Sequence, residues 1–485
     1  MNASVLFKER RRWPPNAPHR GRCIAMVVTR VEVTPKQGQG MRDVRGDSIR
    51  RQLLSDHSVS ATEVRSIVGF LIKSDISEEE IATRSDDLFT DPIIETGFIN
   101  TLAMSNSEIF PTSPDCVITI GFKPGVTDNP GKAAVDGFHT IFPQAKDAEI
   151  STYITYAFYG LPSDCDSQWL AGTIYNGLIQ RALVSDSAAC ANGNWPEIEF
   201  PERPLQVFTT PKRVNLEISD AELEELSYTG LLALNLEEMQ TIQGHYRDDA
   251  TRNIREAIGI SPDAPTDVEL ECLAQTWSEH CKHKIFASKI HHVDTETGED
   301  TIIDSIFKTH IMNPTHDMQK DVDWLLSVFH DNSGVIAWDD DWSICMKAET
   351  HNSPSALDPY GGAMTGIVGV NRDILGTGLG ARPIANTDVF CFGPPDWEGD
   401  LLDNLFHPSR VLRGVHAGVR VGGNESGIPT VNGAIVFDDR YIGKPLVYCG
   451  TIGIMPRRLA DGRESHIKTP TSGDIVYMVG GRVGY

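Results

Sequence analysis

The feature that most constrains the fold is an internal repeat in the N-terminal half of the chain. In the first copy, valines alternate with polar residues over 27–33, and a Pro/Gly turn, a helical stretch and a second strand follow. The segment 114–161 repeats this order, and Lys36 corresponds to Lys123, at an offset of about 86 positions. Chance similarity of two β–α patterns is the alternative. Because the match extends over several elements, we predict two copies of one small α/β unit.

Composition narrows the classes of protein to which the chain can belong. The 485 residues carry a formal net charge of −24, which argues against unspecific binding to nucleic acid or to an anionic membrane. No apolar run approaches the roughly 18 residues that a membrane span needs. Nine cysteines are scattered without a CxxC pair, as is typical of a reducing compartment. We therefore expect a cytoplasmic protein without a nucleic-acid or membrane partner.

Changes in composition divide the first part of the chain. Residues 1–25 are rich in Arg and Pro but lack the apolar core of a signal peptide. A transit peptide is an alternative, but we expect a disordered extension. The repeat units are predicted at 26–105 and 114–190, followed by a proline-containing linker at 191–215. Helical patterns then predict a helical domain over 216–290.

A dense polar run, "QTWSEHCKHKIF", continues a predicted helix that starts at a capping box formed by Thr266 and Glu269. On one continuous helix, an apolar stripe comprises Leu270, Leu273, Ala274, Trp277 and Cys281. This pattern predicts that Cys281 lies in the core and that His280 lies at the rim, where it can meet a ligand. A zinc site is the alternative, but His280, Cys281 and His283 cannot all reach one metal from a single helix.

The segment "WSICMKAET", 342–350, is predicted to be a strand, on which side chains alternate between two faces. One face is apolar and comprises Ile344, Met346 and Ala348. Lys347 and Glu349 share the opposite face, and His351 continues it if the strand extends. A surface ion pair would also explain Lys347 and Glu349. A cation, a carboxylate and an imidazole in file nevertheless favour a functional site.

A glycine-rich stretch over 351–383 follows this strand. As a loop, it would offer backbone N–H groups to phosphates. Within it, Arg372 suits a phosphate or carboxylate and Asp373 suits Mg²⁺. The chain contains neither a Walker A motif nor GxGxxG, so neither common nucleotide loop applies.

The pattern from about residue 300 onward is mixed α and β. Strands are predicted at 301–311 and 446–455, and helices at 317–332 and 403–419. A last strand is predicted at 473–485, before a Gly-rich turn.

Four motifs together resemble the phosphoribosylformylglycinamidine synthase (PurL) family of purine biosynthesis. They are "TWSEHCKHKIF", "KAETHNSP", "GVNRDILGTGLGARP" and "GIPTVNGAIVFD", and their order and spacing agree with the family over about 215–485. The two N-terminal repeats resemble the small PurS subunit, which long-chain members of the family carry fused at the N-terminus.

The resemblance implies an α+β chain. Two PurS-like α/β units precede a helical linker domain and a PurM/PurL-type synthase N-terminal, ATP-binding domain at 291–457, which has a mixed sheet with helices on one side. Residues 458–485 would begin the synthase C-terminal domain. We therefore expect a fragment of a longer protein or one piece of a split enzyme, whose partner is the missing synthase half or a second copy. A non-catalytic assembly subunit that docks that half or a glutaminase is the alternative.

The resemblance also implies a reaction. ATP, with Mg²⁺, phosphorylates the amide oxygen of formylglycinamide ribonucleotide, and ammonia from a glutaminase subunit displaces the phosphate to form the amidine. Transferred to this chain, the catalytic residues are His280 and His351, the ATP contacts are Lys347 and His283, the Mg²⁺ ligands are Glu349 and Asp373, and the substrate contacts are Thr350, His351, Asn352, Ser353 and Arg372. The family usually has His at the position of Ser353 and Tyr at that of His283, so both swaps put the specificity of the site in question.

Overall fold

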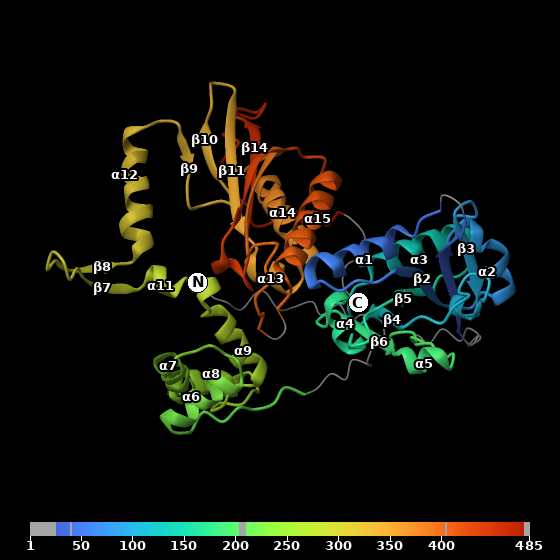
Figure 1. Ribbon diagram of the computed structural model, residues 1–485. Coiled ribbons are helices and arrows are strands. Elements are labelled where there is room, and N and C mark those ends of the chain that lie inside the picture. Colours follow the sequence, from blue (N-terminus) through green and yellow to red (C-terminus); the bar gives the residue numbers. More distant parts are fainter. Residues whose placement is uncertain (1–25, 39–40, 203–209, 403–404, 480–485) are drawn as a thin grey trace.

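The computed structural model describes residues 26–38, 41–202, 210–402 and 405–479. The predicted extension at 1–25 lies outside these residues. Figure 1 shows an N-terminal sheet domain, a group of helices and a C-terminal sheet domain. None of the described helices is long and apolar enough to cross a membrane.

The N-terminal sheet domain contains the predicted repeat. The first copy comprises β1 (Val27–Pro35), α1 (Val44–His57), β2 (Glu63–Ser74), α2 (Glu78–Arg84) and β3 (Glu95–Ile99). The second comprises β4 (Cys116–Phe122), α3 (Asn129–Ile141), β5 (Glu149–Tyr159), α4 (Ser167–Ile174), β6 (Gln180–Ser185) and the short α5 (Ser187–Ala191). The strand order is β3-β1-β2-β5-β4-β6. Antiparallel pairing of β2 with β5 therefore joins two equivalent three-stranded halves.

Equivalent helix caps confirm the duplication. Asp43 caps α1 and also accepts hydrogen bonds from the backbone and hydroxyl of Ser66 on β2. In the second copy, Asp128 caps α3 and accepts the same two bonds from Thr152 on β5. A carboxylate at the N-cap satisfies free N–H groups of the first helical turn. In both copies it also ties the helix to the neighbouring strand.

Both faces of this sheet are covered. One face packs against α1 and α3 through two clusters that contain Leu53 and Phe138. On the other face, Ile198 packs against Leu71 and Tyr153. The segment that the sequence marked as a linker therefore begins by crossing the sheet.

The helical domain comprises α6 (Asp220–Thr229), α7 (Leu236–Arg247), α8 (Asp249–Ala257) and α9 (Asp267–Thr276). The predicted capping box of Thr266 and Glu269 is present at the start of α9. The prediction of one continuous helix is wrong, because α9 ends at Thr276 and Ser278 caps a separate turn, α10 (Glu279–Lys282), before α11 (Lys284–Ala287). Cys281 consequently leaves the apolar stripe and is exposed, so the prediction that it lies in the core is also wrong.

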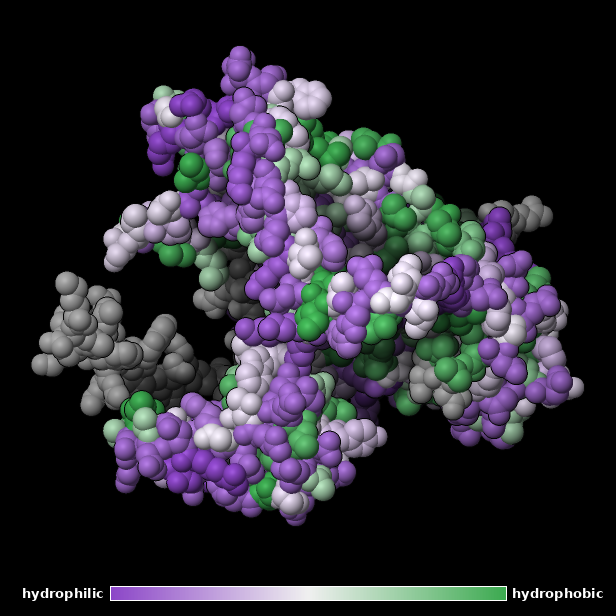
Figure 2. All heavy atoms as spheres, turned by 90° about the vertical axis from the view of Figure 1, so that its left-hand side faces the viewer, coloured by the Kyte–Doolittle hydropathy of each residue, from purple (hydrophilic) through white to green (hydrophobic). Residues whose placement is uncertain are grey.

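The segment between the helical domain and the second sheet departs from the predicted pattern. A hairpin of β7 (Lys289–Val293) and β8 (Asp300–Asp304) precedes a π-helical turn (Lys308–Met312) and α12 (Asn313–Asp321). The predicted strand at 301–311 is thus strand only at its start, and the predicted helix at 317–332 ends early. Figure 2 views the molecule from the side to which this hairpin projects in Figure 1, and most of the visible surface is hydrophilic.

The C-terminal sheet domain has the predicted mixed sheet with helices on one side. Its elements are β9 (Leu325–Ser327), β10 (Gly334–Ala337), β11 (Trp342–Thr350), α13 (Asn352–Leu357), α14 (Pro359–Gly376), β12 (Arg382–Phe392), α15 (Pro408–Ser426), β13 (Thr430–Phe437) and β14 (Leu446–Pro456). The strand order is β13-β12-β14-β11-β10-β9, in which β12 and β13 are parallel. α14 and α15 pack on one face through Ile367, Val415 and Val447.

Most of the glycine-rich stretch forms helices, and residues 377–381 form a short loop, so the prediction of a loop over the whole stretch is wrong. It contains α13 and α14. The glycines permit close helix packing: a Cβ on Gly418 of α15 would lie 2.2 Å from the carbonyl oxygen of Tyr360, and one on Gly362 would lie 2.5 Å from that of Pro354. The predicted strand at 473–485 is also not observed in its described part, 473–479, where Val476 is exposed.

Candidate active site

The strand β11 presents the predicted file of polar side chains. Ser343 and Cys345 are buried on its helix-covered face, and because strand side chains alternate, Lys347 and Glu349 continue that face. The opposite, apolar face is open, and Met346 on it is 44% exposed. The predicted separation of the two faces is therefore correct, but the helices cover the face of Lys347 and not the apolar one.

An ion pair links this strand to α14. The Nζ atom of Lys347 lies 3.0 Å from Oδ2 of Asp373, and both side chains are about 30% exposed. Arg372 precedes Asp373 on α14 and is exposed. The structure thus brings together a lysine and an aspartate that the sequence placed in two separate motifs.

His351 is held in one orientation at the end of the strand. Its backbone N–H donates to the carbonyl of Val447, and its Nδ1 lies 2.6 Å from the carbonyl oxygen of Gly362 on α14. Because a carbonyl can only accept, Nδ1 must carry the proton. In the neutral ring, Nε2 therefore has a free lone pair and can accept a proton.

The residues next to His351 differ in whether their side chains are hydrogen-bonded or exposed. The Oδ1 atom of Asn352 accepts a hydrogen bond from the backbone N–H of Val447 at 2.8 Å, which leaves the amide nitrogen to meet a ligand. Thr350 and Ser353 are exposed. This turn therefore combines one fixed amide with two accessible hydroxyls beside His351.

His280 and His283 lie in the broken helical segment and are exposed. Lys284 anchors this segment to α7 through a 2.7 Å ion pair with Glu238. His283 joins α10 to α11 with a φ of 51°, a left-handed conformation that is uncommon for a residue other than glycine. Among the described residues, no hydrogen bond or ion pair joins His280 or His283 to β11. His280 and His283 therefore lie on a different segment from His351 and, within the described part of the chain, make no direct bond to its strand.

The carboxylates suit a cation that also binds phosphate. No cluster of three or more His, Cys, Asp or Glu side chains able to hold a metal occurs in the described part of the chain. Mg²⁺, however, is commonly bound by one or two carboxylates together with water and substrate phosphates. Glu349 and Asp373 fit that arrangement, since both lie on elements that meet beside Lys347.

Comparison with known proteins identifies this region. Residues 223–284 match the family described as "Formylglycinamide ribonucleotide amidotransferase linker domain", and residues 330–455 match "AIR synthase related protein, N-terminal domain". The PurL subunit of phosphoribosylformylglycinamidine synthase from Thermoplasma acidophilum is 34% identical over 265 residues, which cover 55% of this chain and 29% of the relative. This part of the chain is therefore similar to proteins of the PurL family.

A further PurL relative and a solved structure match over a shorter part of the chain. The PurL subunit from Nocardia farcinica is 37% identical over 211 residues, 43% of this chain and 23% of the relative. A crystal structure of phosphoribosylformylglycinamidine synthase II from Thermotoga maritima is 30% identical and covers 43% of this chain and 27% of its own, with a TM-score of 0.27, too low to establish a common overall fold. The chain spans 29% to 30% of the length of the Thermoplasma PurL relatives.

Sequence reasoning missed a buried polar network beneath the PurL-like site. The Oδ1 atom of Asn371 accepts hydrogen bonds from Asn386 at 2.9 Å and from Thr451 at 2.8 Å, and all three side chains are buried. The network ties α14 to β12 and β14 next to Asp373. The available signal was the position of Asn371 next to Arg372: on a helix whose Arg372 faces solvent, Asn371 points inward and needs a polar partner.

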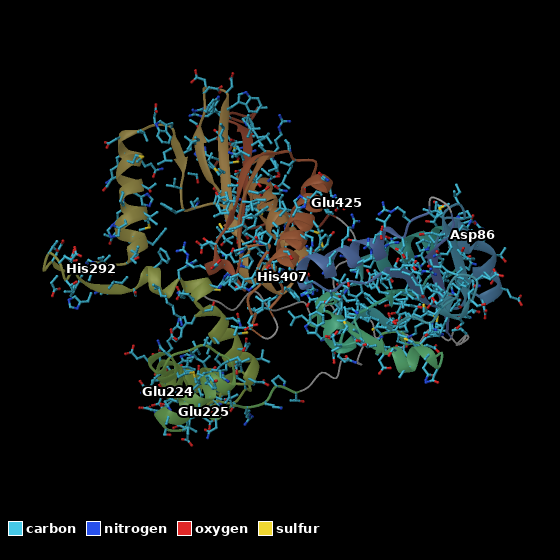
Figure 3. The ribbon with its side chains drawn as sticks, in the orientation of Figure 1. Asp86, Glu224, Glu225, His292, His407 and Glu425 are labelled. Carbon is cyan, nitrogen blue, oxygen red and sulfur yellow. The ribbon has the colours of Figure 1, made fainter. Side chains whose placement is uncertain are left out.

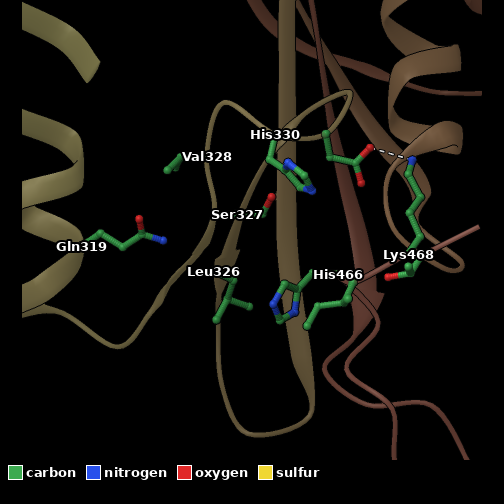
Figure 4. A pocket seen from close by; sticks show the side chains of 10 residues that line it. Gln319, Leu326, Ser327, Val328, His330, His466 and Lys468 are labelled. Atoms are coloured by element: carbon green, nitrogen blue, oxygen red, sulfur yellow. Dashed lines mark ion pairs between the residues drawn. The ribbon is translucent and has the colours of Figure 1, made fainter. Parts of the chain in front are cut away.

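Two cavities lie away from the residues of the predicted site, although the second is lined by residues 428–435 of the fourth PurL-like motif. One, of about 370 Å³, is lined by His330 and His466 near the ion pair of Asp331 with Lys468 (Figure 4). The other, of about 570 Å³, lies between α15 and β13. Neither is lined by a residue of the predicted site, which is an open surface at the junction of β11 and α14.

Proposed function

We propose that this chain supplies one part of an ATP-dependent phosphoribosylformylglycinamidine synthase. The reaction would convert formylglycinamide ribonucleotide and ammonia into formylglycinamidine ribonucleotide. The observation that carries the proposal is that Lys347 and Glu349 share one face of β11, with His351 directly after the strand and Asp373 paired with Lys347 from α14. The similarity of the region to PurL proteins supports this assignment.

The proposed roles follow from side-chain chemistry. Lys347 would contact the phosphates of ATP, and Glu349 and Asp373 would hold Mg²⁺. When bound, Mg²⁺ would neutralise charge on the triphosphate. His283 would contact the nucleotide from the linker segment. Two of the Thermotoga maritima PurL structures are complexes with ADP and with ATP.

The two histidines would move protons. His351 would accept a proton at Nε2, because its Nδ1–H is already given to Gly362. His280 is exposed on α10 and would act from the opposite side of the substrate. A Thermotoga maritima PurL structure is named as a complex with FGAR. Its ribonucleotide would here meet Thr350, Asn352, Ser353 and Arg372.

The same proposal covers partners and compartment. The N-terminal repeats would be PurS-like units, a glutaminase would supply ammonia, and a synthase half or a second copy would complete the site. The reaction would take place in the cytoplasm. The curated relatives are themselves named as a subunit.

Phosphate release tests the proposal. The purified chain would be assayed with formylglycinamide ribonucleotide, Mg-ATP and ammonium chloride, alone and with a complementing synthase half. Release that vanishes in His280→Ala and in Glu349→Ala would support it. Full activity of either variant would show the site assignment to be wrong. No release with the complementing half, together with capture of a glutaminase, would favour a non-catalytic assembly subunit.

A further inference from the structure

The N-terminal repeat domain meets the C-terminal sheet domain at a contact that we call the docking junction. On the repeat domain it comprises Asp56, His57, Trp169, Thr173 and Asn176, and on the sheet domain Leu357, His407, Arg410 and Arg413. Figure 3 labels His407 where the two domains meet. The repeat domain contributes the end of α1 and the α4–β6 region to this contact.

The junction pairs a buried carboxylate with an arginine whose side chain is 45% exposed. Arg413 makes a bidentate pair with Asp56, whose side chain is 1% exposed. Although burial opposes its ionisation, this guanidinium lowers the pKa of Asp56. Arg410 donates to the carbonyl of Thr173 at 2.8 Å, and its burial beside Arg413 lowers its pKa to about 10. Desolvated charges are costly unless they are paired, so the contact requires both domains in this arrangement.

The duplication shows which junction residues serve docking and which serve the fold. At the turn before β3, the Oδ1 atom of Asp91 accepts from the N–H of Ile93 at 2.9 Å. At the equivalent turn before β6, the Oδ1 atom of Asn176 accepts from the N–H of Leu178 at 3.0 Å. An aspartate therefore suffices for the turn. The amide adds one donor, and that donor bonds to the carbonyl of Leu357 at 2.9 Å.

The bonded carbonyl belongs to the site segment. Leu357 is the last residue of α13, which begins at Asn352 directly after His351. The other end of this segment is fixed to β14 through His351 and Asn352, both bonded to Val447. The repeat domain thus holds the end of the segment that the sheet does not hold.

We propose that the repeat domain positions the site segment 351–357 through the docking junction, with Asn176 as the positioning residue. The claim that the junction positions this segment rests on these contacts alone. The consequence for turnover rests on the proposed function. A change at the junction should therefore loosen α13 and reach the ribonucleotide contacts without touching them.

Hydrogen exchange of the full chain tests the claim about positioning. Asn176→Asp keeps the turn, since Asp91 supports the same turn in the first copy, but removes the donor to Leu357. We expect exchange in 351–358 to accelerate at least fivefold, because the loss of one ordinary hydrogen bond gives that factor and the new carboxylate would also repel the carbonyl oxygen of Leu357. Asp91→Asn is the matched control and should exchange as the unaltered chain does. Unchanged exchange in Asn176→Asp would overturn the proposal.

Two further measurements keep the test decisive. If Asn176→Asp lowers the melting temperature of the whole chain, the paired variant Asp56→Asn with Arg413→Met applies the same exchange test. In an assembly that turns over, Asn176→Asp should raise KM for the ribonucleotide about fivefold with kcat within twofold, whereas a purely structural defect would lower the active fraction at unchanged KM. Absence of turnover by the unaltered assembly would count against the proposed function and leave the exchange result to decide the positioning role.

Discussion

Lys347 on β11 and Asp373 in the last turn of α14 form a 3.0 Å ion pair. Both side chains remain partly exposed, so a ligand can reach either partner. When ligands bind, such a lysine can release the aspartate and contact a phosphate, and the aspartate can bind a metal ion. If the proposed function is correct, the pair would be the ligand-free form of the ATP site.

Replacing Asp373 by Asn should weaken Mg-nucleotide binding far more than it weakens the fold. A partly exposed ion pair contributes at most about 1 kcal/mol to stability. The loss of a metal ligand should lower affinity at least ~10-fold, the effect that even indirect metal contacts reach. Calorimetric titration with a non-hydrolysable ATP analogue and Mg²⁺ measures this. Asp317→Asn, which breaks the exposed pair with Lys320 on α12, is the matched control. Equal affinity of both variants would contradict the metal role.

Two replacements of His351 should separate its anchoring from its chemistry. Asn places an amide donor near the position of Nδ1 and should keep the bond to Gly362. Gln places its amide farther out and should lose that bond, at a cost of about 1 kcal/mol. Because neither side chain supplies a base, phosphate release should be lost in both. Chemical denaturation and the release assay together check this, and an active His351→Asn variant would exclude the proposed base.

The repeat could be predicted because its determinants are local. Strand alternation and recurring turn residues are visible in a single sequence, and the caps Asp43 and Asp128 act over a few residues. The tertiary neighbours of the two copies could not be predicted from such local patterns. Asn176 and Asp91 look alike in sequence, and only the tertiary contact with Leu357 gives the amide a separate role.

The candidate site was predictable along the strand but not across it. The period of two placed Lys347 and Glu349 on one face. It did not show that α14 covers that face, because the glycines that let α14 pack against its neighbours also resemble those of a loop. The end of α9 was missed for a related reason. Ser278 begins a new turn by capping it, and that local bond outweighs the apolar period that would carry Cys281 into the core.

Acidification should loosen the docking junction through His57. Burial lowers the pKa of this imidazole, His407, Arg410 and Arg413 act in the same direction, and Asp56 opposes them; Trp169 packs against the ring. The folded pKa thus lies below the unfolded value of about 6.5. The unfolded chain then binds more protons at mildly acidic pH, so stability is full above that value and falls as the pH drops below it.

Thermal unfolding at pH 7.5 and 5.5 measures this effect. His57→Gln keeps a polar side chain but cannot be protonated, so its melting temperature should fall less between the two values than that of the unaltered chain. His292→Gln, on the exposed β7 strand, is the control and should behave as the unaltered chain does. Parallel losses in all three proteins would show that His57 does not govern the acid response.

Adding one methyl group to a glycine should have opposite effects on the two helices of the sheet domain. A Cβ at Gly418 of α15 would lie 2.2 Å from the carbonyl oxygen of Tyr360, so Gly418→Ala must push α15 from α14. We expect a loss of about 1–3 kcal/mol, the usual cost of overpacking. Gly369 of α14 has no atom within 4 Å of an added Cβ, and Gly369→Ala should gain about 0.5–1 kcal/mol from lower backbone entropy. Denaturant unfolding of both variants measures the difference. If Gly418→Ala were as stable as Gly369→Ala, the two helices would not be in close contact at Tyr360.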